Sequence, residues 1–376
     1  MAALRSGDAA AARTFFGRVT ASGAVDASVW VALAMAERAL GDHGGSERSA
    51  DQALALDRAN VRALLLKADA RAAAGDQRAA SAFYKSAIER AGATPPAELA
   101  GELRRAADVV TRHHQAYLDH LSAELVASGY DPERASGRFN RAVELLQGRR
   151  QVYLQQPRHF YFPELPQVQF YEREVFPWLP AVEAATHAIR AELLAVLESE
   201  GAFQPYVERD PNRPGMDRYG LVGDPNWSAF YLWKHGSVVA ENAARCPAAM
   251  AALAHAPLAT TPGRTPSCLF SLLRPGARIP PHTGYLNTRL ICHLPLIVPA
   301  GCGIRVGNET RAWEEGRALI FDDSIEHEAW NGGESLRVVL LFDIWRPELT
   351  EDERRLVSAT LQAVDTFGGA AQPWGD

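Results

Sequence analysis

The stretch PPHTGYLNTRLICHLPL, residues 280–296, places a histidine in front of a run that alternates like a β-strand. Other short β-prone runs surround it between residues 267 and 345 and alternate with turn signals: SCLFSLL, GIRVG, ALIF and LRVVLLFDIW. Short strands at such close spacing favour an all-β sandwich or barrel over βαβ units. The sequence therefore predicts an all-β domain in this part of the chain.

The first hundred residues are rich in alanine and prone to form helices. They carry three Gly-Asp pairs spaced 34 residues apart, beginning at Gly7, Gly41 and Gly75. A period of 34 with a helix–turn–helix unit resembles the tetratricopeptide repeat, and each glycine would then occupy the turn between two helices. Chance recurrence is the alternative, which three pairs in register disfavour. We expect such repeats over residues 1–95 and a helical cap or linker over residues 96–154.

The composition changes near residue 155, where a segment rich in proline and aromatic residues, QQPRHFYFPELPQVQFYEREVFPWLP, has no helical period. The run AVEAATHAIRAELLAVLE, residues 181–198, predicts one helix. We expect an α+β multidomain protein in which a helical solenoid precedes a β domain over residues 155–350. A C-terminal helix and tail would follow over residues 351–376, with a frayed end at residues 367–376.

The bulk composition narrows the class of protein. The 376 residues carry a formal net charge of −6 and no basic tract, which disfavours a nucleic-acid partner. No apolar run approaches the roughly 20 residues that a membrane helix needs. The N-terminal stretch lacks the pattern of a signal peptide, so we expect a cytoplasmic protein. The four cysteines have no CxxC spacing and are expected to be free thiols.

Chemistry-bearing residues gather in the predicted β domain. His282, His293 and His327 lie there, and Arg337 follows inside the apolar run LRVVLLF. A buried charge without a partner is costly, so Arg337 requires solvent, a protein carboxylate or an anionic ligand. Two histidines followed by an arginine within a strand is the order expected of an oxygenase that binds iron and 2-oxoglutarate.

The run PHTGYLNTRLICHLPLIVPAGCGIRVGNETRAWEEGRALIFDDSIEHEAWNGG, followed by LRVVLLFDIWRPELT, resembles the aspartyl/asparaginyl β-hydroxylase family. The upstream stretches WSAFYLWKHG and FYFPELPQVQFYERE fit the same family. The resemblance implies a double-stranded β-helix of the jelly-roll or cupin-like type. It also implies a dioxygenase that uses Fe(II), 2-oxoglutarate and O2 to hydroxylate an aspartyl or asparaginyl residue of a peptide or protein.

The resemblance also implies the metal ligands. His282 and His327 would bind the iron, and Gly284 would stand where a carboxylate usually follows the first histidine. Water would then fill the third position. We expect open space beside Gly284, with no carboxylate reaching it from Asp322 or Asp323.

The co-substrate contacts follow from the same resemblance. Arg337 and Ser271 would hold the distal carboxylate of 2-oxoglutarate, and Trp227 would line the same pocket. His293 would lie at the other end of the co-substrate, near the metal-chelating keto acid.

The sequence departs from the animal enzyme at two positions near this site. The backbone of Ile291 and Cys292 would lie beside the co-substrate, but the animal enzyme has an arginine in place of Ile291. Arg289, on the same strand face, either substitutes for it or forms a surface pair. Leu269 replaces a basic residue associated with the peptide substrate. The animal substrate class, an epidermal-growth-factor-like domain, therefore does not carry over directly.

Two other functions stay open. In the first alternative, the chain is an enzyme whose substrate is a free amino acid, a small metabolite or a lipid acyl chain, since a lipid hydroxylase shares this domain type. Alternatively, the chain is a non-catalytic scaffold whose repeats bind a partner. The presence of His282, His327 and Arg337 together favours an enzyme. In either case the repeats offer a concave surface for a peptide or protein.

Overall fold

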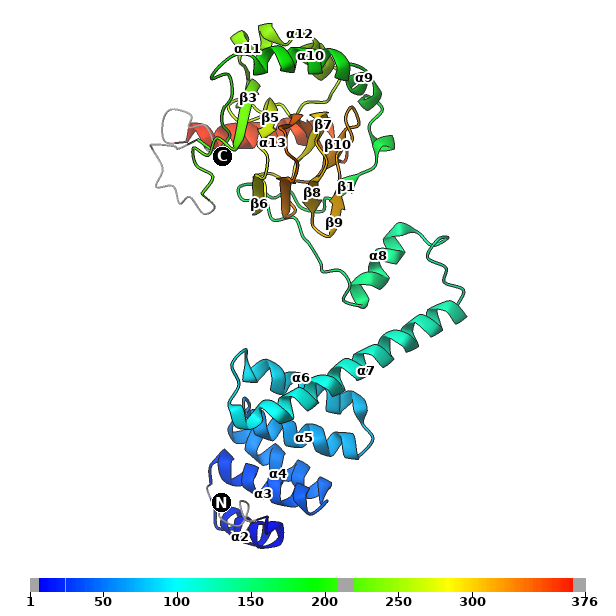
Figure 1. Ribbon diagram of the computed structural model, residues 1–376, viewed down its shortest axis with the longest axis vertical. Helices are drawn as coiled ribbons and strands as arrows, with labels where there is room; N and C mark the ends of the chain where they lie inside the picture. Colours follow the sequence, from blue (N-terminus) through cyan, green and yellow to red (C-terminus); the bar gives the residue numbers. More distant parts are fainter. Residues whose placement is uncertain (1–6, 24, 209–219, 368–376) are drawn as a thin grey trace. The chain divides into compact units, whose positions relative to one another are not determined.

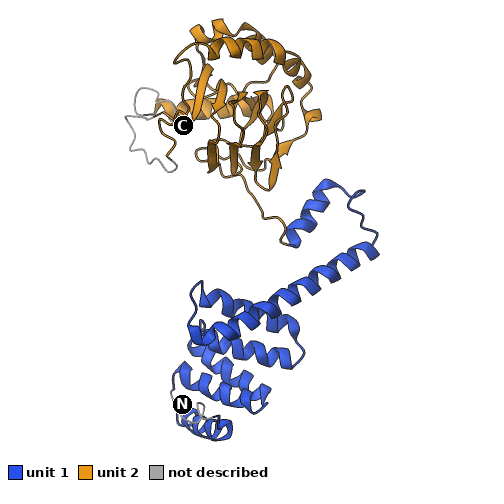
Figure 2. Ribbon diagram, in the orientation of Figure 1, with its two compact units in different colours: residues 1–147 blue, residues 148–376 orange. Residues whose placement is uncertain are grey.

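The computed structural model describes residues 7–23, 25–208 and 220–367, and it separates into two compact units, residues 1–147 and 148–376 (Figures 1 and 2). The division falls inside residues 96–154, the expected cap or linker, so that segment contributes to both units. Most of the expected frayed end, residues 368–376, lies outside the described residues. Among the described helices, none combines the length and apolar composition needed to cross a bilayer.

The first unit is a stack of helices in which each helix from α2 to α7 packs against the next in the chain (Figure 1). The helices are α2 (Ala9–Ala21), α3 (Ala27–Ala39), α4 (His43–Leu56), α5 (Val61–Ala73), α6 (Gln77–Ala91), α7 (Ala100–Ala127) and α8 (Gly137–Leu146), with a 3-10 turn η1 (Ala97–Leu99) before α7. Ala53 and Ala87, one predicted period apart, are fully buried between neighbouring helices. Small side chains at these positions let the helices approach closely.

The Gly-Asp pairs at Gly41 and Gly75 form the helix-to-helix turns that the repeat period predicts, whereas the residues before Gly7 lie outside the described part of the chain. Gly41 and Gly75 take φ angles of 77° and 82°, a left-handed backbone that favours glycine. Each following aspartate caps the next helix: Asp42 accepts from the Gly45 N–H at 2.8 Å and Asp76 from the Ala79 N–H at 2.9 Å. The 34-residue spacing therefore records one turn and one cap per repeat.

The second unit is a double-stranded β-helix made of two antiparallel sheets (Figure 1). The larger sheet has the order β1-β10-β7-β12-β5-β3-β2, with β4 added beside β3, and the smaller has the order β6-β11-β8-β9. The strands are β1 (Phe170–Tyr171), β2 (Gln204–Pro205), β3 (Trp227–Lys234), β4 (Ser237–Val238), β5 (Cys268–Leu273), β6 (Arg278–His282), β7 (Arg289–Ile297), β8 (Cys302–Val306), β9 (Glu309–Arg311), β10 (Leu319–Phe321), β11 (His327–Asn331) and β12 (Arg337–Trp345). From β5 onward the chain passes repeatedly between the sheets, which brings distant segments together.

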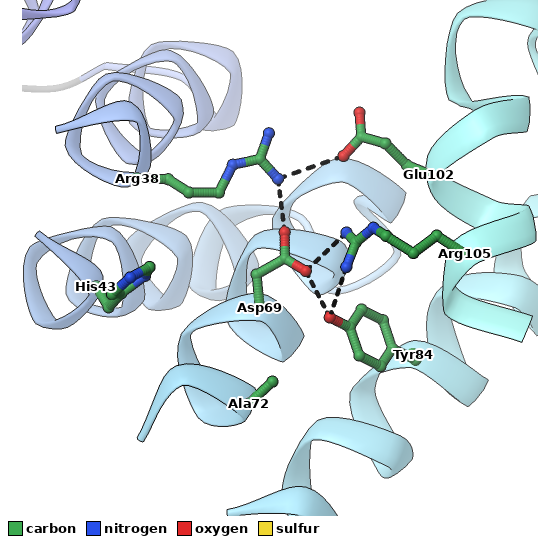
Figure 3. Close-up of a pocket in the computed structure, with 7 residues that line it drawn as sticks. All are labelled: Arg38, His43, Asp69, Ala72, Tyr84, Glu102 and Arg105. Carbon is green, nitrogen blue, oxygen red and sulfur yellow. Dashed lines mark hydrogen bonds and ion pairs between the residues drawn. The ribbon is translucent and has the colours of Figure 1, made fainter. Parts of the chain in front are cut away.

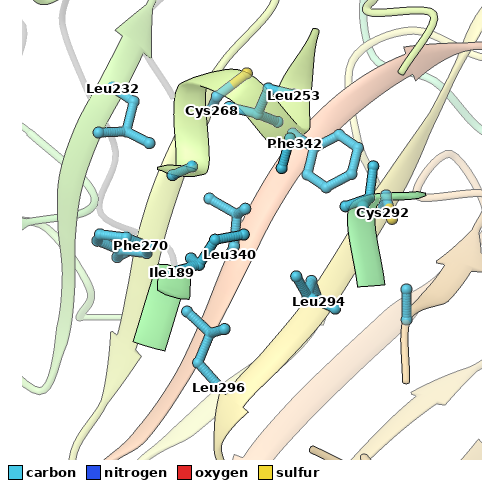
Figure 4. Packing of buried hydrophobic residues seen from close by; sticks show 14 of the residues in the cluster. Ile189, Leu232, Leu253, Cys268, Phe270, Cys292, Leu294, Leu296, Leu340 and Phe342 are labelled. Atoms are coloured by element: carbon cyan, nitrogen blue, oxygen red, sulfur yellow. The ribbon is translucent and has the colours of Figure 1, made fainter. Parts of the chain in front are cut away.

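The larger sheet is buried on both faces. One face packs against α9 (Leu179–Ala184), α10 (Thr186–Leu197), α11 (Ala240–Arg245) and α12 (Pro247–Leu253), and Figure 4 shows Leu294 and Phe342 in that layer. The other face meets the smaller sheet through a second core that includes Ile291 and Val339. Burial on both sides explains why β5 and β7 are apolar at nearly every position rather than at alternate ones. Each fully buried leucine or phenylalanine contributes about 1.5–3 kcal/mol.

The helix predicted over residues 181–198 is instead two helices, α9 and α10, that meet at Ala185. The Thr186 hydroxyl donates to the Glu183 carbonyl at 2.6 Å, and the Glu183 carboxylate is held by Arg173 and by the Ala318 N–H. Arg173 and Ala318 lie outside the predicted helix, so its apolar periodicity does not report their contacts with Glu183.

Two further expectations of the second unit are confirmed. The C-terminal helix α13 (Glu351–Thr366) begins with a capping box between Thr350 and Glu353. The four cysteines are buried free thiols.

Candidate metal and co-substrate site

His282 and His327 lie side by side at the end of the smaller sheet. They are direct register partners in the antiparallel pair of β6 and β11, and their ring centroids are 4.1 Å apart. Residues directly opposite each other in such a pair project from the same face. Strand pairing therefore joins two histidines that are distant in the sequence.

Both histidines have the protonation state that a metal ligand needs. Nδ1 of His282 lies 2.8 Å from the Pro280 carbonyl oxygen, and Nδ1 of His327 lies 3.0 Å from the Ile325 carbonyl oxygen. A carbonyl oxygen only accepts, so each Nδ1 carries the proton and each Nε2 keeps its lone pair. Burial lowers the pKa of both imidazoles and keeps them neutral. A neutral imidazole whose N–H is held by a carbonyl is typical of a metal ligand.

A buried ion pair fixes the turn that leads into His327. The Asp322 carboxylate lies 2.8 Å from Nη1 of Arg346, and both side chains are fully buried. The other oxygen of Asp322 accepts from the Ser324 N–H at 3.0 Å and from the Ser324 hydroxyl. Asp322 therefore has a structural role in this turn.

The expectation of open space beside Gly284 is wrong. The Asp323 carboxylate packs against that glycine so closely that a Cβ built there would stand 2.1 Å from Oδ2. Glycine fits at position 284 because a side chain there would overlap this carboxylate. Burial raises the pKa of Asp323 to about 7, although the charge of Arg289, 3.1 Å away, opposes the rise. Within the described ranges, no group of three His, Cys, Asp or Glu side chains is arranged to hold a metal, so Asp323 is not grouped with the two histidines as a ligand.

Arg337 is a buried cation without an anionic partner among the described residues. It is 1% exposed, its Nη1 donates to the Ser271 carbonyl at 3.4 Å, and its Nε has no partner. Burial lowers the pKa of Arg337 to about 10. The similarly buried Arg264 and Arg346 are each paired with an aspartate. An unpaired charge in the core is costly, so Arg337 marks a place where an anion would be stabilised.

A chain of ring contacts connects Arg337 with the histidine pair. Its guanidinium lies 4.9 Å from the centre of the Trp313 ring, and the Trp313 centroid lies 6.0 Å from that of His293. The His293 ring is 5.0 Å from Phe321, which is 5.5 Å from His327. The arginine and the histidines therefore face the same region between the two sheets.

Trp227 and Ser271 close the other side of this region. The Trp227 ring lies 6.4 Å from His282, and its Nε1 donates to the Ser271 Oγ at 3.3 Å. The carbonyl of the same serine accepts from Arg337. Burial, with a smaller effect of the Arg337 charge, lowers the pKa of His293 to about 3, so this imidazole is neutral.

The other sequence-predicted residues divide between the two faces of β7. Ile291 lies in the core between the sheets, on the side of the site. Cys292 points the opposite way, into the core beneath the helices, because neighbouring residues alternate along a strand (Figure 4). Its thiol is therefore not part of the site.

Arg289 lies on the same face as Ile291 but is neutralised. It contacts Asp343 at 2.6 Å and Asp323 at 3.1 Å. Although burial alone would lower the pKa of Arg289, these two carboxylates hold it above its ordinary value. Arg289 is thus a structural cation, whereas Arg337 has no counter-charge in the part of the chain that the structure describes.

Comparison with known proteins identifies the family. A family model described as aspartyl/asparaginyl beta-hydroxylase matches residues 183–347. Aspartate beta-hydroxylase domain-containing protein 1 of Mus musculus is 30% identical over 271 residues, which cover 68% of this chain and 68% of that protein. The chain belongs to the aspartyl/asparaginyl beta-hydroxylase family.

Two other relatives show the range within this family. The aspartyl/asparaginyl beta-hydroxylase of Mus musculus is 45% identical over 173 residues, 46% of this chain and 22% of that protein. The ornithine lipid ester-linked acyl 2-hydroxylase of Rhizobium tropici is 37% identical over 180 residues, 47% of this chain and 60% of that protein. This chain thus matches about a fifth of the mouse hydroxylase.

Two side chains around the site of this beta-hydroxylase family member were not predicted, and a third was placed wrongly. Trp313 and Phe321 form the ring contacts between Arg337 and His327, and Asp323, which was expected to stay away from Gly284, fills the space beside it. The position of Phe321 in the strand before His327 offered a weak signal. The sequence offered no signal for Trp313 or for the Asp323 contact, because both depend on how loops fold against the sheets.

The first unit carries a separate polar pocket of about 610 Å³, shown in Figure 3. Asp69 lies at its centre and accepts from Arg38 at 2.6 Å, from Arg105 at 2.8 Å and from the Tyr84 hydroxyl. Glu102 lies 3.4 Å from Arg38 and balances the second positive charge. These residues come from α3, α5, α6 and α7, so the network ties successive repeats together.

Proposed function

We propose that this protein is an Fe(II)- and 2-oxoglutarate-dependent dioxygenase that hydroxylates its substrate. The observation that carries the proposal is Arg337, a buried guanidinium that no carboxylate of the described residues pairs with, facing the same region as His282 and His327. A dicarboxylate co-substrate supplies the missing negative charge, and two neutral imidazoles supply metal ligands. Membership of the beta-hydroxylase family supports the same reaction class.

The histidine pair fits a metal. Nε2 of His282 and Nε2 of His327 are unprotonated, and their rings are held by backbone carbonyls, so each would offer a lone pair to iron. Bound iron with 2-oxoglutarate and O2 supplies the oxidising chemistry that replaces a C–H hydrogen by hydroxyl. The buried Asp323 lies beside Gly284, two residues from the first ligand, and places a carboxyl group there without joining the ligand set.

The remaining side chains orient the co-substrate. Arg337 would bind the distal carboxylate of 2-oxoglutarate through its planar fork, with Ser271 beside it. The Trp227 N–H donates to the Ser271 hydroxyl and fixes its position. His293 is neutral, so it would add no competing positive charge at the other end of the co-substrate. The apolar walls formed by Trp313 and Phe321 exclude water from the same region.

The proposed substrate is an aspartyl or asparaginyl residue of a peptide or protein, and the helical repeats of the first unit are proposed to help hold it. The names of the mouse relatives support this class. The Rhizobium tropici acyl 2-hydroxylase supports the alternative, hydroxylation of a lipid acyl chain or another small molecule. A non-catalytic scaffold has no need for an uncompensated buried Arg337.

Turnover of 2-oxoglutarate tests the proposal. The purified protein should form succinate from 2-oxoglutarate with Fe(II) and O2, with or without a coupled substrate. His282→Ala and His327→Ala should lose metal binding and at least about a hundredfold in succinate formation, whereas His187→Ala, an exposed histidine on α10, should match the wild type. A wild-type protein that neither binds Fe(II) nor consumes 2-oxoglutarate would end the enzyme hypothesis.

A further inference from the structure

An N-terminal arm of the second unit lies against the loop that follows His282. The Arg158 N–H donates to the Gly284 carbonyl at 3.1 Å, and the His159 N–H donates to the Tyr285 carbonyl at 3.0 Å. Phe160 continues the contact as a parallel bridge to Leu286. Three successive backbone contacts therefore fix the position of the Arg158 backbone relative to the metal-site loop.

The Arg158 side chain is exposed at this place. Its guanidinium lies 5.4 Å from the centre of the Tyr285 ring, and the His159 ring packs on the same tyrosine with centroids 4.7 Å apart. No carboxylate in the described part of the chain forms an ion pair with Arg158. The aromatic ring orients the guanidinium but leaves its hydrogen-bond donors available.

Arg158 is the charged residue that this arm places beside the metal-site loop. Its backbone N–H bonds to the carbonyl of Gly284, two residues after His282. Arg289, the other arginine near this loop, is already bound to two aspartates. Among the described arginines near the metal site, Arg158 and Arg337 are thus the two that lack a carboxylate, one exposed and one buried.

We propose that Arg158 binds a carboxylate of the substrate, the side chain of an acidic residue in a peptide, and so determines specificity. Arg337 is enclosed in the core and suits the co-substrate, whereas Arg158 is open to an incoming peptide. A guanidinium matches a carboxylate with two parallel hydrogen bonds, and the flanking Tyr285 holds it in a plane. This inference rests on the proposed function, because it assigns the substrate of the same site.

Binding without turnover tests the inference. The full chain is loaded with Mn(II) in place of Fe(II), together with 2-oxoglutarate. It is titrated by calorimetry with two blocked nonapeptides that differ only in a central aspartate or asparagine. The wild type should bind the aspartyl peptide roughly tenfold to hundredfold more tightly, the range for a charge-assisted pair. Arg158→Gln should abolish that preference and Arg158→Lys should keep part of it.

The controls separate recognition from folding. Arg355→Gln removes an exposed arginine on α13 and should leave the preference unchanged. The thermal shift caused by 2-oxoglutarate should be the same in Arg158→Gln and the wild type, because Arg158 does not touch the co-substrate site. Added salt should weaken the aspartyl preference, since an exposed ion pair is screened.

Four results would overturn the inference. The first two concern the wild type: no peptide binding at millimolar concentration, or equal affinity for the two peptides. The other two are an aspartyl preference that survives Arg158→Gln and Arg158-dependent binding of phosphatidylserine vesicles instead of peptide. Failure of the proposed function is distinct, because it is seen as absent 2-oxoglutarate consumption by the Fe(II) protein. Intact consumption with an unchanged peptide preference in Arg158→Gln refutes this inference alone.

Discussion

Replacing Arg337 by methionine should stabilise the ligand-free protein while removing its response to 2-oxoglutarate. Most substitutions of a fully buried side chain destabilise a protein. Arg337 should differ because its positive charge is buried without a carboxylate among the described residues, and methionine fills a similar volume without that charge.

The magnitude follows from the lowered pKa. A pKa of about 10 for Arg337 corresponds to roughly 3 kcal/mol of unfavourable free energy in the charged form. Because the folded-state pKa lies below the unfolded value, this cost is fully present at neutral pH and declines only as the pH rises beyond about 10. The contact with Trp313 offsets about 1–2 kcal/mol of it. Arg337→Met should therefore gain about 1–2 kcal/mol, or about 2–8 °C in the melting temperature.

Thermal unfolding followed by tryptophan fluorescence measures this change, since Trp30 is the one tryptophan outside the second unit. With Mn(II) present, a hundredfold excess of 2-oxoglutarate over its Kd should stabilise the wild type by about 2.7 kcal/mol and leave Arg337→Met unchanged. Arg346→Met is the matched control: it strands the buried Asp322 and should cost about 3–5 kcal/mol. The reasoning is refuted if Arg337→Met loses as much stability as Arg346→Met, or keeps the 2-oxoglutarate shift.

Three further predictions concern other contacts. Gly284→Ala should lower the free energy of unfolding, measured by urea titration, by about 1–3 kcal/mol because the new Cβ overlaps the Asp323 carboxylate. Adding Asp323→Ala should recover part of this loss, whereas additive losses would contradict the contact. Burial raises the pKa of Asp323 to about 7, so between about pH 4 and 7 the native state keeps a proton that the unfolded chain releases. The wild type should lose stability over this range while Asp323→Asn does not, so the stability of the variant relative to the wild type should rise. Parallel pH profiles of the two proteins would argue against this. In the first unit, Asp69→Asn should lower the free energy of unfolding, followed by circular dichroism, by about 2–4 kcal/mol. Arg105 is half-exposed, so Arg105→Gln should lower it by about 1 kcal/mol. Equal losses would show that Asp69 is not the centre of the network.

Local signals in the sequence predicted the architecture well. The 34-residue spacing of Gly41 and Gly75 identified the repeat turns, because a left-handed glycine followed by a capping aspartate is a short-range requirement. Short apolar runs between turn residues identified the strands. The one helix predicted over residues 181–198 was divided at Ala185 by contacts with distant residues, which periodicity does not record.

What the sequence by itself determined is the set of groups that the second unit contains: two histidines at strand ends, and an arginine within an apolar strand. The tertiary structure decided which of these groups are neutralised. Arg289 and Arg337 both occupy apolar strands, yet among the described residues carboxylates meet Arg289 and not Arg337, because β12 places Asp343 beside Arg289 and a turn brings Asp323. The same turn closes the space beside Gly284. Charge pairing and packing depend on segments joined across the two sheets, so they follow from the fold and not from local pattern.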